Sequence, residues 1–289
     1  MTAYWELVLA LSDDVEEGLT NFLWEQGALG VVAEQEAEHG PRLRAFFAGS
    51  VDRGRLEAEL AAYLGSLEAL GFAAPWPALL TPLADGNWAD AWRKHFRPVA
   101  VARRLLIAPP WEVPVAPGRV AVVIEPGRAF GTGHHASTAG CLEALEALVQ
   151  PPPAAVLDLG TGSGILAIAA VRLGVGRVLA VDEDPDALAS AVANAGRNGV
   201  ADRIQCLRAD AGALRTTPVP LVLANLLTAA HLRLAADYAR YVAAGGALVL
   251  GGILEPEGTA VATALGDHGF APEATSSHEG WTTLVMRRA

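Results

Sequence analysis

The chain is poor in cysteine and has no long apolar stretch. Its 289 residues include two cysteines, Cys141 and Cys206, and neither belongs to a CxxC pair. This argues against a disulfide scaffold and against a structural zinc site. No apolar run reaches the roughly 18 uncharged residues that a membrane-spanning helix needs. The first eleven residues contain Glu6 and no basic start, unlike a signal peptide, so we expect a cytoplasmic protein with no membrane span.

Positive charge is also scarce. The chain has 21 Lys and Arg residues against 32 Asp and Glu, a formal net charge of −11. Broad binding to a phosphate backbone normally requires a basic surface, so we expect no strong direct binding to nucleic acid. An acidic chain suits a basic protein partner better.

Apolar patterning in the first 82 residues predicts the element order βαββαβ. The expected strands and helices, in chain order, cover residues 4–11, 13–26, 29–34, 43–48, 53–70 and 78–81. This order is typical of a ferredoxin-like α+β domain. Prolines at positions 75, 77 and 82 then interrupt regular structure, so we place the domain over residues 1–82.

Residues 83–98 are predicted to form a linker helix. Trp88, Trp92 and Phe96 recur at helical spacing and would share one face of it. Packing against the second domain is the simplest interpretation of this face, and contact with a substrate is the alternative.

From residue 99 to residue 289, strand-like and helix-like segments alternate, which predicts a doubly wound α/β sheet. The last two strand-like segments, residues 273–277 and 282–286, follow one another as a hairpin. One strand near the end should therefore run antiparallel to the rest, in a sheet of seven strands.

A glycine-rich turn joins the first long strand and helix of this second domain. Gly160, Gly162 and Gly164 form the pattern G-x-G-x-G, and Asp158 lies two residues before it. Glycine accepts a positive φ and lets a ligand approach the backbone, while the helix N-terminus presents free N–H groups. A dinucleotide-binding turn would have glycine where Ile165 stands. The pattern resembles motif I of the class I S-adenosylmethionine (SAM) methyltransferases, although a tight turn without a ligand is the alternative.

Polar residues follow four of the predicted parallel strands, namely Asp158, Asp182, Asp210 and Asn225. Ligands of open α/β sheets bind at the carboxyl ends of strands, so these residues should converge on one crevice. Asp182 lies about twenty residues after the first glycine, where an acid is expected to bind ribose. Asp210 is our candidate for the adenine amino group. Each residue alone could merely cap a helix.

A second glycine-rich loop covers residues 125–138. We expect Phe130, Gly131 and Gly133 to bring this loop over the methionine end of the cofactor, and Thr138, at the start of the next helix, to hydrogen-bond it. His134 and His135 are adjacent and lack both i+4 spacing and nearby acids, so we predict no metal site. A flexible loop that only caps the helix is the alternative.

Residues 225–228 read Asn-Leu-Leu-Thr. Many amino-methylating enzymes have Asn-Pro-Pro-aromatic here, and its amide and carbonyl groups align the accepting nitrogen. The aromatic residue that would cover the acceptor is missing. This favours an aliphatic amine over a nucleobase amine.

Taken together, these motifs resemble the ribosomal protein L-eleven methyltransferase family (PrmA). The resemblance rests on residues 125–138, 158–170, 181–185 and 224–226 and on the tryptophan-rich connector. It implies that Thr138, Gly160, Asp182 and Asn225 bind the cofactor. It further implies an N-terminal domain that recognises the large-subunit ribosomal protein and a SAM domain, residues 99–289, that methylates its lysine and N-terminal amines.

The sequence therefore predicts a monomeric SAM-dependent protein N-methyltransferase with Asn225 as its catalytic residue. An RNA methyltransferase, a nicotinamide dehydrogenase and a SAM-binding adaptor without turnover are the alternatives. The predicted cofactor-binding residues are Thr138, Gly160, Asp182, Asn225, Phe130, Gly131, Gly133, Asp158, Gly162 and Asp210.

Overall fold

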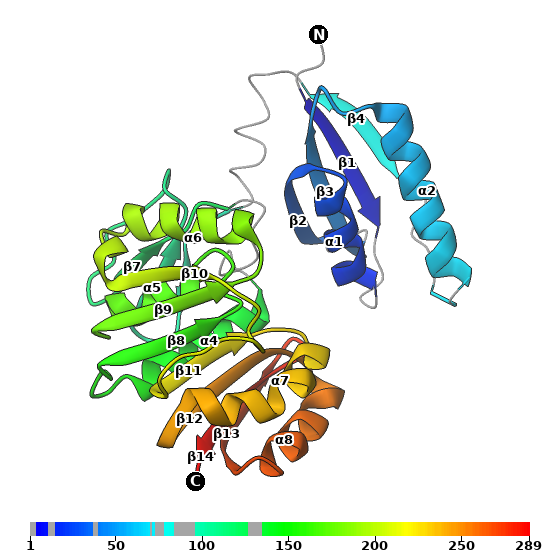
Figure 1. Cartoon of the computed structure of the whole chain (residues 1–289). Coiled ribbons are helices and arrows are strands. Elements are labelled where there is room, and N and C mark those ends of the chain that lie inside the picture. Colours follow the sequence, from blue (N-terminus) through cyan, green and yellow to red (C-terminus); the bar gives the residue numbers. More distant parts are fainter. Residues whose placement is uncertain are drawn as a thin grey trace. The chain divides into compact units, whose positions relative to one another are not determined.

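The computed structural model describes residues 4–10, 15–36, 40–69, 71–72, 78–83, 96–126 and 135–289. The chain divides into two compact units, Met1–Arg97 and Pro98–Ala289 (Figure 1). Most of the predicted linker helix lies outside the described residues, Trp88 and Trp92 included. The linker therefore stays a prediction.

The first unit has the expected βαββαβ order. Its elements are β1 (Tyr4–Ala10), α1 (Glu16–Glu25), β2 (Ala28–Glu36), β3 (Gly40–Ala48), α2 (Arg53–Ala69) and β4 (Leu79–Leu83). The strands form one antiparallel sheet in the order β2-β3-β1-β4. Leu56, Leu60 and Leu64 of α2 are buried at i, i+4 and i+8, in the same core as Leu7 and Leu9 of β1. Alternate side chains of a strand point to one face, so α2 covers that face of the sheet.

The second unit contains a seven-stranded sheet with the order β10-β9-β8-β11-β12-β14-β13. Its strands are β8 (Ala155–Leu159), β9 (Arg177–Asp182), β10 (Ile204–Arg208), β11 (Val219–Asn225), β12 (Val242–Leu254), β13 (Phe270–His278) and β14 (Trp281–Arg288). Strand β14 runs antiparallel to both of its neighbours, β12 and β13. The predicted doubly wound sheet with one reversed strand is confirmed.

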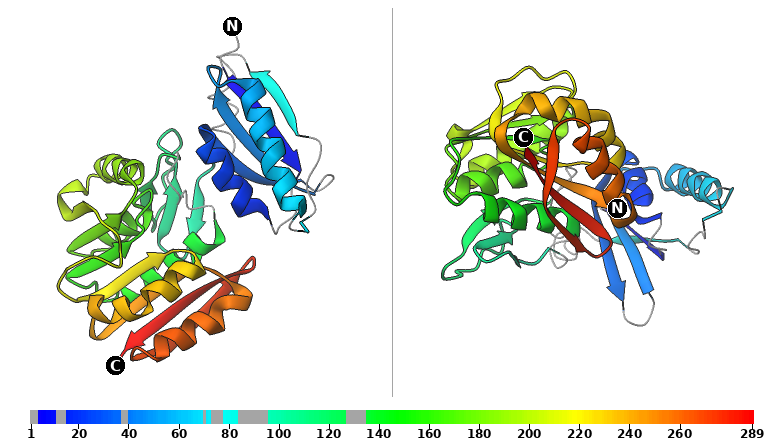
Figure 2. Two further views of the ribbon diagram at one scale, coloured as in Figure 1. Left: turned by 45° about the vertical axis from the view of Figure 1, so that its right-hand side comes forward. Right: turned by 90° about the horizontal axis from the view of Figure 1, so that it is seen from below.

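Helices lie on both faces of this sheet (Figure 2). They are α4 (Ala136–Leu148), α5 (Ile165–Arg172), α6 (Pro185–Arg197), α7 (Thr228–Tyr241) and α8 (Gly258–Gly266). Along β8, Val156 packs in the core formed with α4 and α5, whereas Leu157 packs in the core formed with α7 and α8. This alternation explains the continuous apolar runs of the sequence, because a parallel strand buried on both faces needs apolar side chains on both. No helix of the described chain is long and apolar enough to cross a membrane.

A separate three-stranded sheet precedes α4. It consists of β5 (Val99–Val101), β6 (Leu105–Ala108) and β7 (Val120–Val123), in that order. In the sequence, residues 105–108 and 120–124 are strand-like, which predicts β6 and β7 but neither β5 nor a separate sheet of the three strands. Asn198, next to the end of α6, bonds both backbone groups of Val123, with N–O distances of 2.8 and 2.7 Å. This contact fixes the end of β7, just before the loop that begins at residue 125.

Candidate functional site

The predicted site residues meet at the carboxyl edge of the parallel strands. Strand β8 lies between β9 and β11, and all three run in the same direction. Asp158, Asp182 and Asn225 stand at or next to the ends of these three strands. The topology therefore brings together side chains that are up to 67 residues apart in the sequence.

The glycine-rich turn after β8 has the backbone geometry expected for it. Gly160, Gly162 and Gly164 have φ values of +68°, +53° and +83°, in the left-handed region that favours glycine. The N–H groups of Gly160 and Thr161 both donate to the carbonyl of Val181 in β9, at 2.9 and 3.0 Å. The turn is thereby tied to the neighbouring strand before α5 begins.

Asp158 is fully buried beneath this turn. Its Oδ2 accepts a 2.6 Å hydrogen bond from the Thr161 hydroxyl, which lowers its pKa, but burial has the larger effect and raises the pKa to about 7. Its other oxygen, Oδ1, is buried and has no hydrogen-bond partner among the described residues. This oxygen can accept a hydrogen bond from a ligand.

Asp182 binds the turn itself. Its Oδ2 accepts the Gly162 N–H at 2.9 Å, and its Oδ1 accepts the Asp184 N–H at 3.1 Å. Each carboxylate oxygen has further lone-pair capacity. Asp182 therefore shapes the glycine-rich turn and can still bind a hydroxyl donor.

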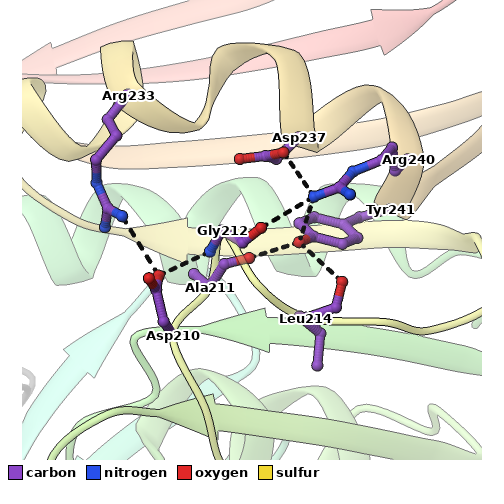
Figure 3. Close-up of polar contacts among 8 residues, drawn as sticks. All are labelled: Asp210, Ala211, Gly212, Leu214, Arg233, Asp237, Arg240 and Tyr241. Carbon is purple, nitrogen blue, oxygen red and sulfur yellow. Dashed lines mark hydrogen bonds and ion pairs between the residues drawn. The ribbon is translucent and has the colours of Figure 1, made fainter.

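Asp210 follows β10 and is exposed. Its Oδ1 accepts the Gly212 N–H at 2.8 Å and contacts the Arg233 guanidinium of α7 at 3.3 Å (Figure 3). The backbone bond from Gly212, followed by the bond from Arg233, holds the pKa of this carboxyl below its usual value. The buried Tyr241 donates to the Ala211 carbonyl at 2.5 Å, which ties the same turn to α7.

Asn225 and Thr138 are in direct contact. The Asn225 Nδ2 donates to the Thr138 Oγ1 at 3.2 Å, and Thr138 is fully buried in the first turn of α4. The Asn225 Oδ1 is buried without a partner within the described chain, and so is the hydroxyl of Thr228 at the start of α7. Buried polar atoms normally have partners, so these atoms fit a ligand that donates hydrogen bonds.

Gly251, on β12, lies close to residues of two other segments, α4 and β11. A Cβ added there would overlap the Cys141 sulfur and would lie 2.9 Å from the Asn225 Oδ1 and 3.2 Å from the Ser137 carbonyl oxygen. The absence of a side chain lets β12 approach both β11 and α4. Sequence reasoning did not identify this position.

The start of the second glycine-rich loop is held by α6. The Asn194 Oδ1 accepts the Glu125 N–H at 3.1 Å, and the Asn194 Nδ2 donates to the Ser163 carbonyl at 2.9 Å. Asn194 thereby joins the bases of the two glycine-rich segments. The sequence alone did not point to Asn194, because an asparagine inside a predicted helix looks the same whether it is exposed or makes buried hydrogen bonds.

Residues 127–134 lie outside the described chain, and with them the predicted cofactor residues Phe130, Gly131 and Gly133. His135, just beyond them, caps α4: its Nδ1 accepts the Ser137 N–H at 3.3 Å. Burial lowers the pKa of His135. Among the described residues, no three His, Cys, Asp or Glu side chains are grouped closely enough to hold a metal ion.

His231 is a buried polar residue that sequence reasoning missed. The buried residues of α7 are His231, Leu234, Ala235, Tyr238 and Tyr241. Their spacing follows one helix face, so the available signal was a histidine on an otherwise apolar and aromatic stripe.

Comparison with known proteins agrees with this fold. The family model described as "Ribosomal protein L11 methyltransferase (PrmA)" matches residues 3–289. A Geobacter sulfurreducens protein of that name is 44% identical over 255 residues, covering 85% of this chain and 81% of the relative. One from Pelobacter propionicus is 36% identical and covers 100% of this chain and 99% of the relative.

A solved structure is also similar to this chain. The crystal structure of a ribosomal protein L11 methylase from Lactobacillus delbrueckii subsp. bulgaricus is 29% identical, with a TM-score of 0.63, over 67% of this chain and 100% of that one. The sheet order and the glycine-rich turn define a class I SAM-dependent methyltransferase. Within that class, the chain belongs to the ribosomal protein L11 methyltransferase (PrmA) family.

Proposed function

We propose that this chain transfers methyl groups from SAM to lysine and N-terminal amines of the large-subunit ribosomal protein L11. The family and its named relatives support the substrate. The structural observation that carries the proposal is the pair of buried acceptor oxygens without described partners, Asp158 Oδ1 and Asn225 Oδ1. Ammonium and amine groups are hydrogen-bond donors that such oxygens can accept.

The residues present fit SAM. Asp158, Gly160, Gly162 and the helix that follows would hold it at the glycine-rich turn, with Asp182 toward the ribose, Asp210 toward the adenine, and Thr138 and Asn225 toward the reacting end. Phe130, Gly131 and Gly133 complete the proposed set. SAM supplies a methyl group on a sulfonium, which passes to a nitrogen lone pair while the carbon–sulfur electrons stay on sulfur. The chain's own task is alignment.

The acceptor nitrogen must be neutral to have a lone pair. Unperturbed pKa values are about 10.4 for lysine and about 7.7 to 8.0 for an α-amine, so a proton has to leave first. We assign this proton to water. The Asn225 Oδ1 then accepts a hydrogen bond from an N–H group of the neutral amine, which keeps the nitrogen lone pair in line with the methyl group.

We assign recognition of the ribosomal protein to residues 1–82 and catalysis to residues 99–289. The net charge of −11 favours a basic protein partner, and we propose that the enzyme acts as a cytoplasmic monomer.

The direct test is intact-mass analysis of purified L11 after incubation with this protein and SAM. Mass gains in steps of one methylene are expected. Asn225→Ala should lower turnover by about 10- to 100-fold, because misplacement of an aligned group costs rates of that order. Gln205→Ala, on the exposed edge of β10, is the matched control and should be neutral. No mass gain on L11, together with transfer of labelled methyl groups to ribosomal RNA in a parallel incubation with labelled SAM, would support the RNA methyltransferase alternative.

A further inference from the structure

The turn between β11 and α7 lacks the features that would stiffen it locally. Residues 226 and 227 are leucines, so no proline ring fixes their φ angles. Leu227 is the N-cap of α7 and supplies no side-chain hydrogen bond to the helix. The peptide that follows Asn225 must therefore be held by other parts of the chain.

The carbonyl of Gly251 holds this turn. It lies beside Asn225 in the parallel pairing of β11 and β12. Its oxygen accepts the Leu226 N–H at 3.1 Å and is 2.8 Å from the His231 Nε2. A carbonyl oxygen only accepts, so Nε2 carries a hydrogen and donates. The oxygen thus has two donors, one from the turn and one from α7.

A second hydrogen bond, to Tyr238, holds the His231 ring in place. The ring is fully buried, and its Nδ1 lies 2.8 Å from the Tyr238 hydroxyl, further along α7. With the ring hydrogen on Nε2, Nδ1 is an acceptor and the tyrosine donates. Burial lowers the pKa of His231 to about 4, so the ring is neutral at pH 7. The neutral ring has one donor and one acceptor, and both are used.

Leu226 connects this arrangement to the rest of the site. A Cβ on Gly160, in the glycine-rich turn, would overlap the Leu226 side chain, and a Cβ on Gly252 would overlap the Leu226 carbonyl oxygen. A small displacement of the Leu226 peptide would therefore move the backbone next to Asn225 and also change the contact with the glycine-rich turn.

We propose that His231 is a positioning residue for methyl transfer: its bond to the Gly251 carbonyl fixes the Leu226 peptide, and with it the Asn225 amide, in a turn without prolines. This inference rests on the proposed function, in which Asn225 orients the amine. His231 does not touch the substrate in this scheme. It acts through Gly251 and Leu226.

Two substitutions distinguish the hydrogen bond of His231 from the space that its side chain fills. His231→Leu introduces an apolar side chain of similar size and removes both the donor to Gly251 and the acceptor for Tyr238. His231→Gln retains an N–H group near the position of Nε2. We expect kcat to fall by about 10-fold or more in His231→Leu, with KM for SAM within about twofold, and His231→Gln to recover most of the loss. His268→Leu, at an exposed position after α8, is the matched control.

Hydrogen exchange of the Leu226 amide, measured on protein labelled with ¹⁵N-leucine, gives a second readout that needs no methyl acceptor. Exchange should be faster in His231→Leu than in the wild type and close to normal in His231→Gln. Unchanged exchange in His231→Leu would overturn the inference. Equal losses of kcat in the Leu and Gln variants, parallel to their losses in thermal stability, would overturn it as well. An inactive wild type with the expected exchange pattern would instead contradict the proposed substrate.

Discussion

The side-chain amide of Asn225 donates to the Thr138 hydroxyl at 3.2 Å and thereby joins two residues 87 positions apart. The contact determines which end of the amide is available. Because the nitrogen is used by Thr138, the oxygen is the free end, and it is buried without a described partner. The site is therefore built to accept hydrogen bonds, which is what a neutral amine needs.

Thr138→Val should impair both stability and turnover. Valine has nearly the same shape but no acceptor, so the amide nitrogen of Asn225 loses its partner. Leaving a buried donor unpaired costs about 1 to 3 kcal/mol, and we expect unfolding free energy to fall by that amount in urea titrations. Turnover should fall by about 10-fold as the amide loses its orientation. Thr138→Ser keeps the hydroxyl and should stay near the wild type; equal losses in both variants would contradict this account.

Gly252→Ala should displace the turn after Asn225. Gly252 has φ +73°, and a Cβ would overlap a backbone atom, the Leu226 carbonyl oxygen, which has little room to move. We expect a loss of about 1 kcal/mol or more in unfolding free energy, with a larger relative loss of turnover. Gly266→Ala, at the end of α8 with no atom within 4 Å of the added carbon, is the control. In urea titrations of both variants, Gly266→Ala should leave the unfolding free energy unchanged or raise it slightly.

Asp158 predicts a specific dependence of stability on pH. Its pKa is about 7 in the folded protein, against 3.8 for an unperturbed side chain. The folded protein therefore keeps a proton that the unfolded chain loses, so this stabilisation is full below pH 3.8 and is lost as pH rises through 7. The change is on the order of a few kcal/mol.

Asp158→Asn cannot ionise and should remove this dependence. Urea unfolding at pH 5 and pH 8 should show the variant gaining stability relative to the wild type at the higher pH. Parallel changes in the two proteins would mean that Asp158 titrates normally. The same variant should bind SAM more weakly, because it lacks the carboxylate that faces a cationic ligand.

Substitutions at Asp210 and Arg233 can show whether Asp210 binds the cofactor or only pairs with a surface arginine. Both side chains are about half exposed, at 49% and 58%, so solvent screens their ion pair and it contributes little to stability. Arg233→Ala should therefore leave the melting temperature nearly unchanged. If Asp210 binds the adenine amino group, Asp210→Ala should weaken SAM binding by about 10-fold in calorimetric titrations, whereas Arg233→Ala should not. Equal affinities for the two variants would remove Asp210 from the cofactor site.

The convergence of Asp158, Asp182 and Asn225 at one edge of the sheet was predictable because each lies at or next to the end of an apolar strand. The runs before Asp158, Asp182 and Asn225 alternate with helical segments, which predicts parallel strands, and the carboxyl ends of parallel strands lie at one edge. The hydrogen bond that Asp182 accepts from the Gly162 N–H was not predictable, since it depends on how closely two turns approach. The bond between His231 and Gly251 joins a helix to a strand twenty residues later, and no local pattern specifies it.

The lack of a side chain at Gly251 has a consequence for how the protein can vary. A carbon added there would meet Cys141, Asn225 and Ser137 at once, and these residues come from α4 and β11, so one compensating change could not relieve all three contacts. Random mutagenesis with selection for active enzyme should therefore return no substitution at this codon. Directed evolution of new acceptor specificity would have to keep position 251 fixed and search other parts of the chain.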